Sequence, residues 1–276
     1  MLDLIKAVVF GAVEGITEWL PVSSTGHMII LDELLKFNQP ANFVNLFLVV
    51  VQLGAIVAVV VLFWRTLWPL RGLGETGPLF RRDQLRLWSR ILVACLPAAI
   101  IGLLFDSYFE KWFYNAPSVA IALIIFGVAF IVVERSRRAK HPRITSLSQI
   151  TIQTALLIGI FQLIAAIFPG TSRSGATIIG ALMLGVSRTV AAEFTFCLAV
   201  PVMFGASLLK IVKYGLNFTG LQIGILLAGM VVAFLVSLLV IKYLMKYIKK
   251  HDFQIFGWYR IGLGVVVILL FLLHVI

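Results

Sequence analysis

GAVEGITEWLPVSSTGH, residues 11–27, is the stretch that decides the fold of this chain. It carries two glutamates before Pro21 and three hydroxyl residues and a histidine after it, in an otherwise apolar setting. A second stretch, GIFQLIAAIFPGTSRSGAT at residues 159–177, repeats this pattern. Three residue pairs align at a single offset: Gly11 with Gly159, Pro21 with Pro169, and Ser24 with Ser172. Each copy predicts an apolar helix that stops at a proline, followed by hydroxyl residues and a new helix.

The composition is that of a polytopic membrane protein. Of the 276 residues, 61% are hydrophobic and only 13% are charged, and soluble domains do not need so much apolar surface. Six runs are long enough to cross the hydrocarbon core: 43–64, 88–105, 117–133, 191–212, 221–241 and 256–275. The remaining apolar segments, 2–20 with 24–35 and 148–168 with 172–186, are interrupted by proline and polar residues. They predict two re-entrant helix pairs, which are tolerated at membrane depth where they are buried or line a cavity.

The basic residues give the chain a predicted orientation. The net charge of +11 could suit nucleic acid, but fifteen of the 23 Lys and Arg lie in three short segments: 65–90, 135–143 and 242–250. Basic clusters beside apolar runs are typical of cytoplasmic loops, and no groove with interleaved aromatics indicates a nucleic-acid partner. With these segments inside and the 106–116 loop outside, span 43–64 and its counterpart 191–212 run in opposite directions.

The halves therefore predict an inverted-topology repeat. The fold class is all-α, with about six transmembrane helices and two re-entrant pairs in a single integral membrane domain, residues 1–276. Repeat 1 covers residues 1–140 and repeat 2 covers residues 148–276. Such repeats place functional residues near the middle of the membrane, where the repeats meet.

The first copy supplies acidic and nucleophilic side chains. Glu14 and Glu18 are four residues apart and share one helix face, and carboxylates inside a membrane are costly unless they are paired or hydrated. They indicate a bound cation or a shared proton, the alternative being a helix end that lies in water. Ser23, Ser24 and Thr25 stand at the start of the next helix, where free N–H groups suit a phosphate. His27 follows one turn later and is a candidate catalytic base, although a lone histidine is more often a hydrogen-bonded core residue.

The second copy supplies the features of a phosphate-binding turn. Its candidates for binding a diphosphate are Gly170, Ser172, Arg173, Ser174 and Thr177. Gly170 permits close backbone approach, the hydroxyls are donors, and Arg173 has a planar fork that fits a phosphate bidentately. The alternative is a structural pair between Arg173 and a glutamate of the first copy. Arg260 lies near a predicted span end, where an interfacial position is expected at least as readily as a functional one.

These motifs resemble those of the undecaprenyl-diphosphate phosphatase family, the bacitracin-resistance proteins. The family's E-x-x-x-E pattern stands here as Glu14 to Glu18, followed by PVSSTGH at residues 21–27 and P-G-x-S-R-S-x-x-T at residues 169–177. The resemblance implies removal of the terminal phosphate from undecaprenyl diphosphate, which recycles the lipid carrier for cell-wall synthesis and confers bacitracin resistance. It also implies the bacterial cytoplasmic membrane, a site open to the external face, and dependence on a divalent cation, Mg²⁺ or Ca²⁺.

Two chemical routes stay open at this point. In the first, Ser24 attacks phosphorus, with His27 as its base and later as a general acid. In the second, His27 or Glu18 activates water and Ser24 only binds phosphate. Glu14 and Glu18 would hold the metal through oxygen or orient His27. Arg173 would stabilise charge on the transferring phosphoryl group.

A second class of function uses the same features. Inverted repeats with polar residues at mid-membrane are also typical of secondary transporters, so the alternative is a transporter or a lipid-carrier flippase. The partners expected in either case are a polyprenyl diphosphate and membrane lipids. The glycine-rich segment Ile261–Gly264 would also allow close packing of helices in a homodimer.

Overall fold

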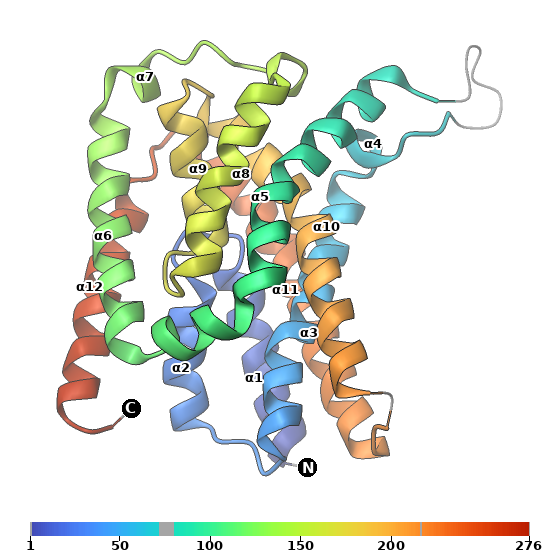
Figure 1. The fold of residues 1–276 in the computed structure, drawn as a ribbon, viewed down its shortest axis with the longest axis vertical. Helices are drawn as coiled ribbons and strands as arrows, with labels where there is room; N and C mark the ends of the chain where they lie inside the picture. Colours follow the sequence, from blue (N-terminus) through green and yellow to red (C-terminus); the bar gives the residue numbers. More distant parts are fainter. Residues whose placement is uncertain (1, 72–79, 216, 276) are drawn as a thin grey trace.

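The computed structural model describes residues 2–71, 80–215 and 217–275, apart from the side chains at 103, 106, 107, 110, 111 and 137. These residues form helices and no β-strand (Figure 1). Six of the described helices are long and apolar enough to cross a membrane: α3 (Ala41–Leu62), α5 (Arg82–Phe113, of which Arg82–Gly102 forms the span), α6 (Ala116–Arg135), α10 (Arg188–Tyr214), α11 (Gly220–Tyr247) and α12 (Gln254–Leu272). The structure therefore confirms an all-α, multi-pass membrane protein.

Four shorter helices form the two predicted hairpins. The first consists of α1 (Leu2–Thr17) and α2 (Ser24–Leu34), and the second of α8 (Ile152–Ile167) and α9 (Arg173–Met183). In Figure 1, α1 and α2 open toward the end of the molecule that carries both termini, whereas α8 and α9 open toward the opposite end. The turns of both hairpins lie in the middle of the bundle. That these hairpins are re-entrant, and that the halves form an inverted repeat in the membrane, stay predictions.

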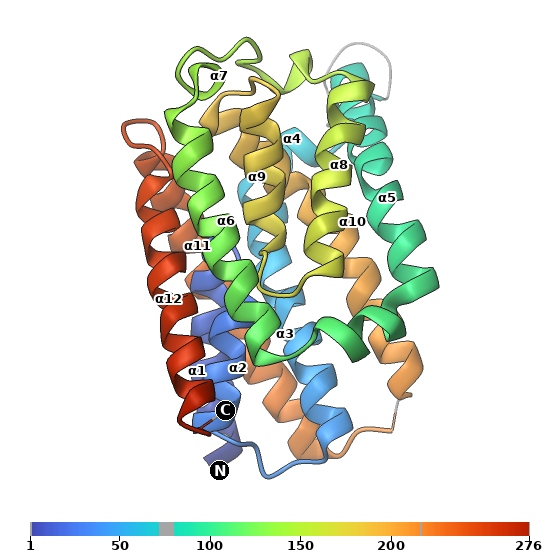
Figure 2. The same cartoon turned by 60° about the vertical axis from the view of Figure 1, so that its left-hand side comes forward.

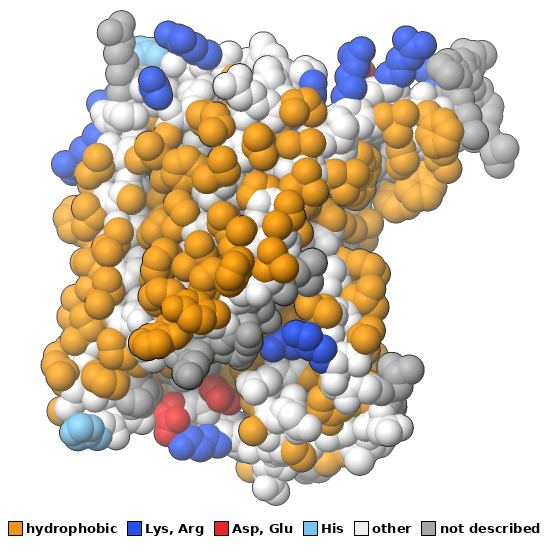
Figure 3. All heavy atoms as spheres, viewed as in Figure 1, with side chains coloured by type: hydrophobic (Ala, Val, Ile, Leu, Met, Phe, Trp, Pro, Cys, Tyr) orange, Lys and Arg blue, Asp and Glu red, His pale blue; other side chains and the backbone are white. Residues whose placement is uncertain are grey.

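The end opposite the termini carries the short elements α4 (Trp64–Leu67), α7 (Arg137–Lys140) and the 3₁₀ helix η1 (Leu147–Gln149). Lys and Arg side chains gather along this end in Figure 3. The three predicted basic segments therefore fall on one end of the molecule, although residues 72–79 lie outside the described part. Which side of the membrane this end faces stays a prediction.

One expected boundary is wrong. We expected a loop at 106–116, but α5 continues to Phe113 and only two residues separate it from α6. No proline or glycine follows Gly102 before Asn115, so nothing stops the helix. The end of α5 bends toward α6 in Figure 1. The polar residues at 106, 110 and 111 that suggested a loop are therefore helical, and their side chains lie outside the described part.

Close contacts between backbones fix the first hairpin in the bundle. A Cβ atom on Gly11 of α1 would overlap the carbonyl of Gly229 in α11, and one on Gly54 of α3 would overlap the carbonyl of Met230. Because only glycine allows this approach, α1 and α3 both pack directly on α11. On another side of the bundle α6 and α12 run side by side (Figure 2). The helix before the first turn is thus held on a rigid support.

Candidate active site

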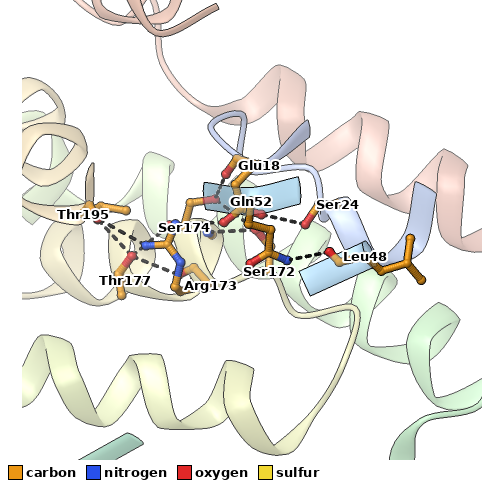
Figure 4. Close-up of polar contacts among 10 residues, drawn as sticks. Glu18, Ser24, Leu48, Gln52, Ser172, Arg173, Ser174, Thr177 and Thr195 are labelled. Carbon is orange, nitrogen blue, oxygen red and sulfur yellow. Dashed lines mark hydrogen bonds and ion pairs between the residues drawn. The ribbon is translucent and has the colours of Figure 1, made fainter. Parts of the chain in front are cut away.

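The two predicted motifs meet in the structure (Figure 4). Arg173 Nη2 donates a hydrogen bond to Glu18 Oε1 over 2.9 Å, although 155 residues separate them in the chain. Ser174 Oγ donates to the backbone oxygen of Glu18 over 3.0 Å. The Arg173 and Glu18 side chains are 13% and 9% exposed, so the hairpins are joined by a largely buried ion pair.

Glu18 lies between the beginnings of two helices. Its second oxygen, Oε2, accepts a hydrogen bond from Ser24 Oγ over 2.7 Å. Ser24 is the first residue of α2 and Arg173 is the first residue of α9. Helix beginnings carry free N–H groups and partial positive charge, and together they form a site for an anion. Glu18 occupies such a position as an anion that belongs to the protein itself.

Both turns end in a strained serine. Ser23 has φ +75° and Ser172 has φ +68°, in the left-handed region that residues other than glycine rarely adopt. Each caps its helix: Ser23 Oγ accepts from Gly26 N over 3.3 Å, and Ser172 Oγ accepts from Gly175 N over 3.2 Å. Such a conformation costs about 1–3 kcal/mol and tends to occur at functional sites. The turns share this cost and this geometry.

The positions of the N-cap serines show that the two copies correspond with a shift of one residue from the alignment expected from the sequence. We expected Ser24 to correspond to Ser172, because the prolines align in that register. By structural role Ser23 corresponds to Ser172, since both are caps with positive φ. Ser24 then corresponds to Arg173, and these two side chains are the ones that hold the two oxygens of Glu18. The copies contribute a hydroxyl and a guanidinium at equivalent positions.

His27 does not pair with Ser24 as expected. Its Nδ1 lies 2.7 Å from the backbone oxygen of Ser23, and its Nε2 lies 2.8 Å from the hydroxyl of Tyr259. The two rings stack with centroids 5.7 Å apart. The imidazole reaches back along α2 toward the residue four before it, as helical side chains do, so both of its nitrogens are engaged. Ser24 therefore has Glu18 as its partner in place of His27.

Arg260 contacts both turns, although the sequence left an interfacial position open for it. It is fully buried in α12 rather than interfacial. Its Nη1 donates to Pro21 O over 3.3 Å, and its Nη2 donates to Gly170 O and Thr171 O over 2.9 and 2.7 Å. It also lies over the ring of Phe126. One guanidinium thus donates hydrogen bonds to both turns. The sequence signal for this linking role was the position of an arginine within an apolar run.

The hydroxyl groups of the second copy form hydrogen bonds mainly with other groups of the protein. Ser172 Oγ and Ser174 Oγ lie 3.1 Å apart. Thr177 Oγ1 donates to Arg173 O over 2.9 Å and accepts from Thr195 Oγ1 over 2.9 Å. Thr195, which the sequence did not indicate, also accepts from Arg173 Nη1 through its backbone oxygen over 3.3 Å. Buried Thr177 and Thr195 therefore fix the orientation of the Arg173 side chain.

Gly170 permits a close approach, but to the protein itself. It has φ +92°, and a Cβ atom there would lie 2.5 Å from the backbone oxygen of Val119 in α6. The turn is therefore pressed against α6, while the Gly170 carbonyl accepts from Arg260. This position demands glycine both for its backbone angle and for the space available.

Several buried side chains in and near the turns have a polar atom without a hydrogen-bond partner among the described residues, and Glu14 and Gln162 are two of them. Glu14, one turn before Glu18 on α1, is 1% exposed, and its Oε1 has no hydrogen-bond partner among the described residues. Gln162 of α8 is 2% exposed, and neither of its side-chain polar atoms has a partner there. In the proline register of the two copies, Gln162 stands where the first copy has Glu14. Buried polar atoms without partners are rare in native proteins and call for a ligand or water.

A cavity of about 260 Å³ adjoins the turns. Its walls come from both hairpins, from α3, α5 and α10, and from one of the two residues that link α5 to α6. They consist of Thr25, Asn45, Leu48, Val49, Phe109, Tyr114, Ala165, Ala166, Ile167, Pro169 and Lys210. Asn45 lies near the start of α3 and Lys210 near the end of α10, so the cavity extends from the turns toward the end of the molecule that carries the termini.

Fold and site together define a multi-pass membrane protein in which a serine and an arginine, at two helix beginnings, hold the largely buried carboxylate of Glu18. The chain belongs to the family of the bacitracin resistance protein BacA, whose family model matches residues 7–266.

Relatives of known name match the chain over nearly its whole length. It is 60% identical to undecaprenyl-diphosphatase of Desulfitobacterium hafniense over 271 residues, covering 98% of this chain and 97% of the relative. It is 57% identical to undecaprenyl-diphosphatase 1 of Clostridium acetobutylicum, covering 99% and 98%. It is 51% identical to undecaprenyl-diphosphatase of Enterococcus faecalis, covering 98% and 97%. The resemblance inferred from the motifs is therefore confirmed.

Proposed function

We propose that this chain is an undecaprenyl-diphosphatase, which hydrolyses undecaprenyl diphosphate to undecaprenyl phosphate and inorganic phosphate. Recycling of the lipid carrier and resistance to bacitracin would follow from this activity. The names of the relatives support it. One observation carries the proposal. Ser24 and Arg173, each the first residue of a helix, both donate hydrogen bonds to the carboxylate of Glu18. A diphosphate has the charge and the oxygen geometry to compete for the same donors.

Ser24 is the proposed nucleophile and Glu18 its base. Ser24 Oγ bonds to the terminal phosphorus, and its proton passes to Glu18 Oε2, which already accepts it over 2.7 Å. The bond from that phosphorus to the bridging oxygen breaks, and polyprenyl phosphate leaves. Water then attacks the phosphoserine, which restores the serine hydroxyl and releases inorganic phosphate. In the alternative route, Glu18 deprotonates water directly and Ser24 only donates to the phosphate.

Arg173 is proposed to exchange Glu18 for the substrate. Its fork fits two phosphate oxygens, and charge that develops on the transferring group is stabilised most by donors already in place. The hydrogen bond from Arg173 to Thr195 O supports this role, because it would keep the guanidinium oriented toward the site while a phosphate replaces Glu18. The same site is proposed to include Ser23, Thr25, Gly170, Ser172, Ser174 and Thr177. Residues at the two helix beginnings would contribute backbone N–H groups, and Thr177 would hold Arg173 in place through its backbone oxygen.

His27 is proposed to return protons rather than to activate Ser24. Its Nε2 lies 2.8 Å from the hydroxyl of Tyr259, and Tyr259 is half exposed. This pair offers a path for protons between the site and the surroundings of the protein. The proposal keeps the general-acid role of His27 and moves the base role to Glu18.

A divalent cation fits the residues present, and we propose it as a cofactor. Among the described residues no group of three His, Cys, Asp or Glu forms a metal site, but Mg²⁺ often takes only one or two carboxylates and completes its shell with water and phosphate oxygens. Glu14 Oε1 is buried without a partner, and Glu18 lies one turn away. Glu14 and Glu18 would hold the ion, which when bound would neutralise negative charge on the phosphates.

The site is proposed to open toward the external face of the bacterial cytoplasmic membrane. The 260 Å³ cavity supports this, because Thr25 and Pro169 connect it to the turns and it extends away from the basic end.

A homodimer is proposed only through the outer face of α12. Gly262 has open space around it, whereas Gly264 packs against Ala120 and Ile124 of α6 and is already used within the chain.

Phosphate release by the purified protein tests this proposal. In detergent, without any membrane gradient, we expect inorganic phosphate to be released from undecaprenyl diphosphate, and release to stop in Arg173→Ala. A matched Arg135→Ala variant, changed at the basic end, should keep full activity. Ion flux coupled to a substrate in sealed vesicles, with no phosphate released in detergent, would instead identify a transporter.

A further inference from the structure

We propose that the basic end of the molecule holds a second anion site, separate from the hairpin turns, which binds the phosphate headgroup of an anionic phospholipid. A cavity of about 310 Å³ lies there. Its walls come from α4, from the first turns of α5 and from η1. They consist of Arg65, Thr66, Asp83, Gln84, Arg86, Leu87, Arg90, Leu147 and Ser148. Three guanidinium groups and two hydroxyl groups thus line one hollow.

The walls of this cavity are held together by specific hydrogen bonds. Trp88 Nε1 donates to Leu67 O over 2.7 Å, and Gln84 Nε2 donates to Arg65 O over 3.3 Å, which fixes α4 against α5. Arg90 Nη1 donates to Leu147 O over 3.2 Å, which fixes η1 against α5. The hollow is therefore built by the fold rather than left between flexible chains.

The described wall residues do not balance the charge in the cavity: three arginines face one aspartate. Among the described residues of its walls Asp83 is the only acidic side chain, and it lies 3.8 Å from Arg86, with both side chains mostly exposed. Arg65 and Arg90 have no carboxylate partner in the part of the chain that the structure describes. Two guanidinium groups that share a hollow without carboxylate partners of their own repel each other, and a phosphate would bridge them with paired hydrogen bonds.

The surroundings indicate a lipid as the source of that phosphate. Trp64 and Trp68 stack at 4.3 Å beside the cavity and are 46% and 42% exposed. Exposed tryptophans in membrane proteins lie at the level of the headgroups. Below them, Leu92 and Leu96 of α5 are exposed and would face acyl chains. Figure 3 shows this order on one face, with Lys and Arg along the end and apolar side chains beyond them. Basic pockets at this depth bind anionic headgroups.

Binding of defined lipids to the whole protein tests the proposal. Lipid-stripped protein in detergent is titrated with dioleoyl phosphatidylglycerol, with dioleoyl phosphatidylcholine, and with inorganic phosphate alone, and native mass spectrometry gives the affinity of the first bound molecule. One arginine near the membrane surface contributes about fivefold in affinity for an anionic lipid. We therefore expect phosphatidylglycerol to bind at least about fivefold more tightly than phosphatidylcholine, and Arg65→Gln to lose about fivefold of that affinity.

A matched variant localises the effect. Arg82 is exposed on the same helix and does not line the cavity, so Arg82→Gln should bind phosphatidylglycerol like the unchanged protein. Arg65 is exposed, so Arg65→Gln should fold, and its phosphate release without added lipid should be unchanged. Equal affinity for the two lipids, or equal losses in Arg65→Gln and Arg82→Gln, would overturn the site. Tight binding of inorganic phosphate that Arg65→Gln removes would overturn the assignment to a lipid.

Discussion

Two adjacent serines in the first turn offer the sharpest test of the proposed chemistry, because the structure gives them different partners. Ser23 caps α2 through Gly26 N, whereas Ser24 donates to Glu18. Ser23→Ala should therefore affect folding, and Ser24→Ala should affect the reaction. We expect Ser24→Ala to release almost no phosphate and Ser23→Ala to keep a substantial part of the activity.

The magnitudes show why stability alone cannot separate the two serines. Loss of a cap costs about 1 kcal/mol, and the φ of +75° at residue 23 stays as strained in alanine as in serine. Loss of the Ser24 hydrogen bond to a carboxylate costs at most about 1.5–3 kcal/mol, and Glu18 keeps Arg173 on its other oxygen. Each kcal/mol lowers Tm by about 2–4 °C in a chain of this size, so both variants melt a few degrees lower.

Activity separates them by a much larger factor. A nucleophile supplies several kcal/mol of barrier lowering, and each 1.36 kcal/mol corresponds to about tenfold in rate. Phosphate release and melting should be measured on the same detergent-purified samples of Ser23→Ala, Ser24→Ala and Ser24→Cys, with the cysteine variant keeping a trace of activity. If Ser24→Ala keeps more than about a tenth of the original turnover, attack by serine is excluded and water activated by Glu18 or His27 takes its place.

Three further outcomes follow from the site and the fold. Arg173→Lys keeps the charge but loses the fork, so turnover should fall at least about a hundredfold; near-normal turnover would make Arg173 a structural ion-pair partner only. Arg260→Met should lower kcat at least about tenfold with little change in Tm, since relief of a buried charge offsets the lost hydrogen bonds; a large fall in Tm with unchanged kcat would contradict a positioning role. Single cysteines in a cysteine-free background should react with an impermeant thiol reagent in intact cells at Asn115 but not within 135–147, and the reverse pattern would invert the predicted orientation.

The fold was readable from the sequence because its signals are local. The apolar runs located the six candidate spans, and α1 and α8 each end before the proline that was expected to stop them, α1 at Thr17 and α8 at Ile167. The end of α5 was missed because polar residues in 106–111 were interpreted as a loop. Polarity does not stop a helix unless a breaker accompanies it, and there is none before Asn115.

The candidate site was readable in its residues but not in its pairing. The motifs identified Glu18, Ser24 and Arg173, and the structure brings these three together. Proximity in sequence suggested that His27 would serve Ser24. The direction of a helical side chain decided otherwise and turned the imidazole toward Ser23 O and Tyr259. Partners that come from distant segments, such as Tyr259 and Thr195, leave no pattern in the motifs themselves.

The backbone strain in the two turns and the buried charge of Arg260 explain each other. Two serines at positive φ would relax if their turns were free, and an arginine with no carboxylate partner among the described residues would be too costly to bury alone. Arg260 donates to the carbonyls of Pro21, Gly170 and Thr171, so its charge is solvated by backbone dipoles while both turns are pinned. Each feature therefore offsets part of the cost of the other. The same turns set the beginnings of α2 and α9. Arg260 therefore fixes the distance between Ser24 and Arg173, the two residues that donate to Glu18.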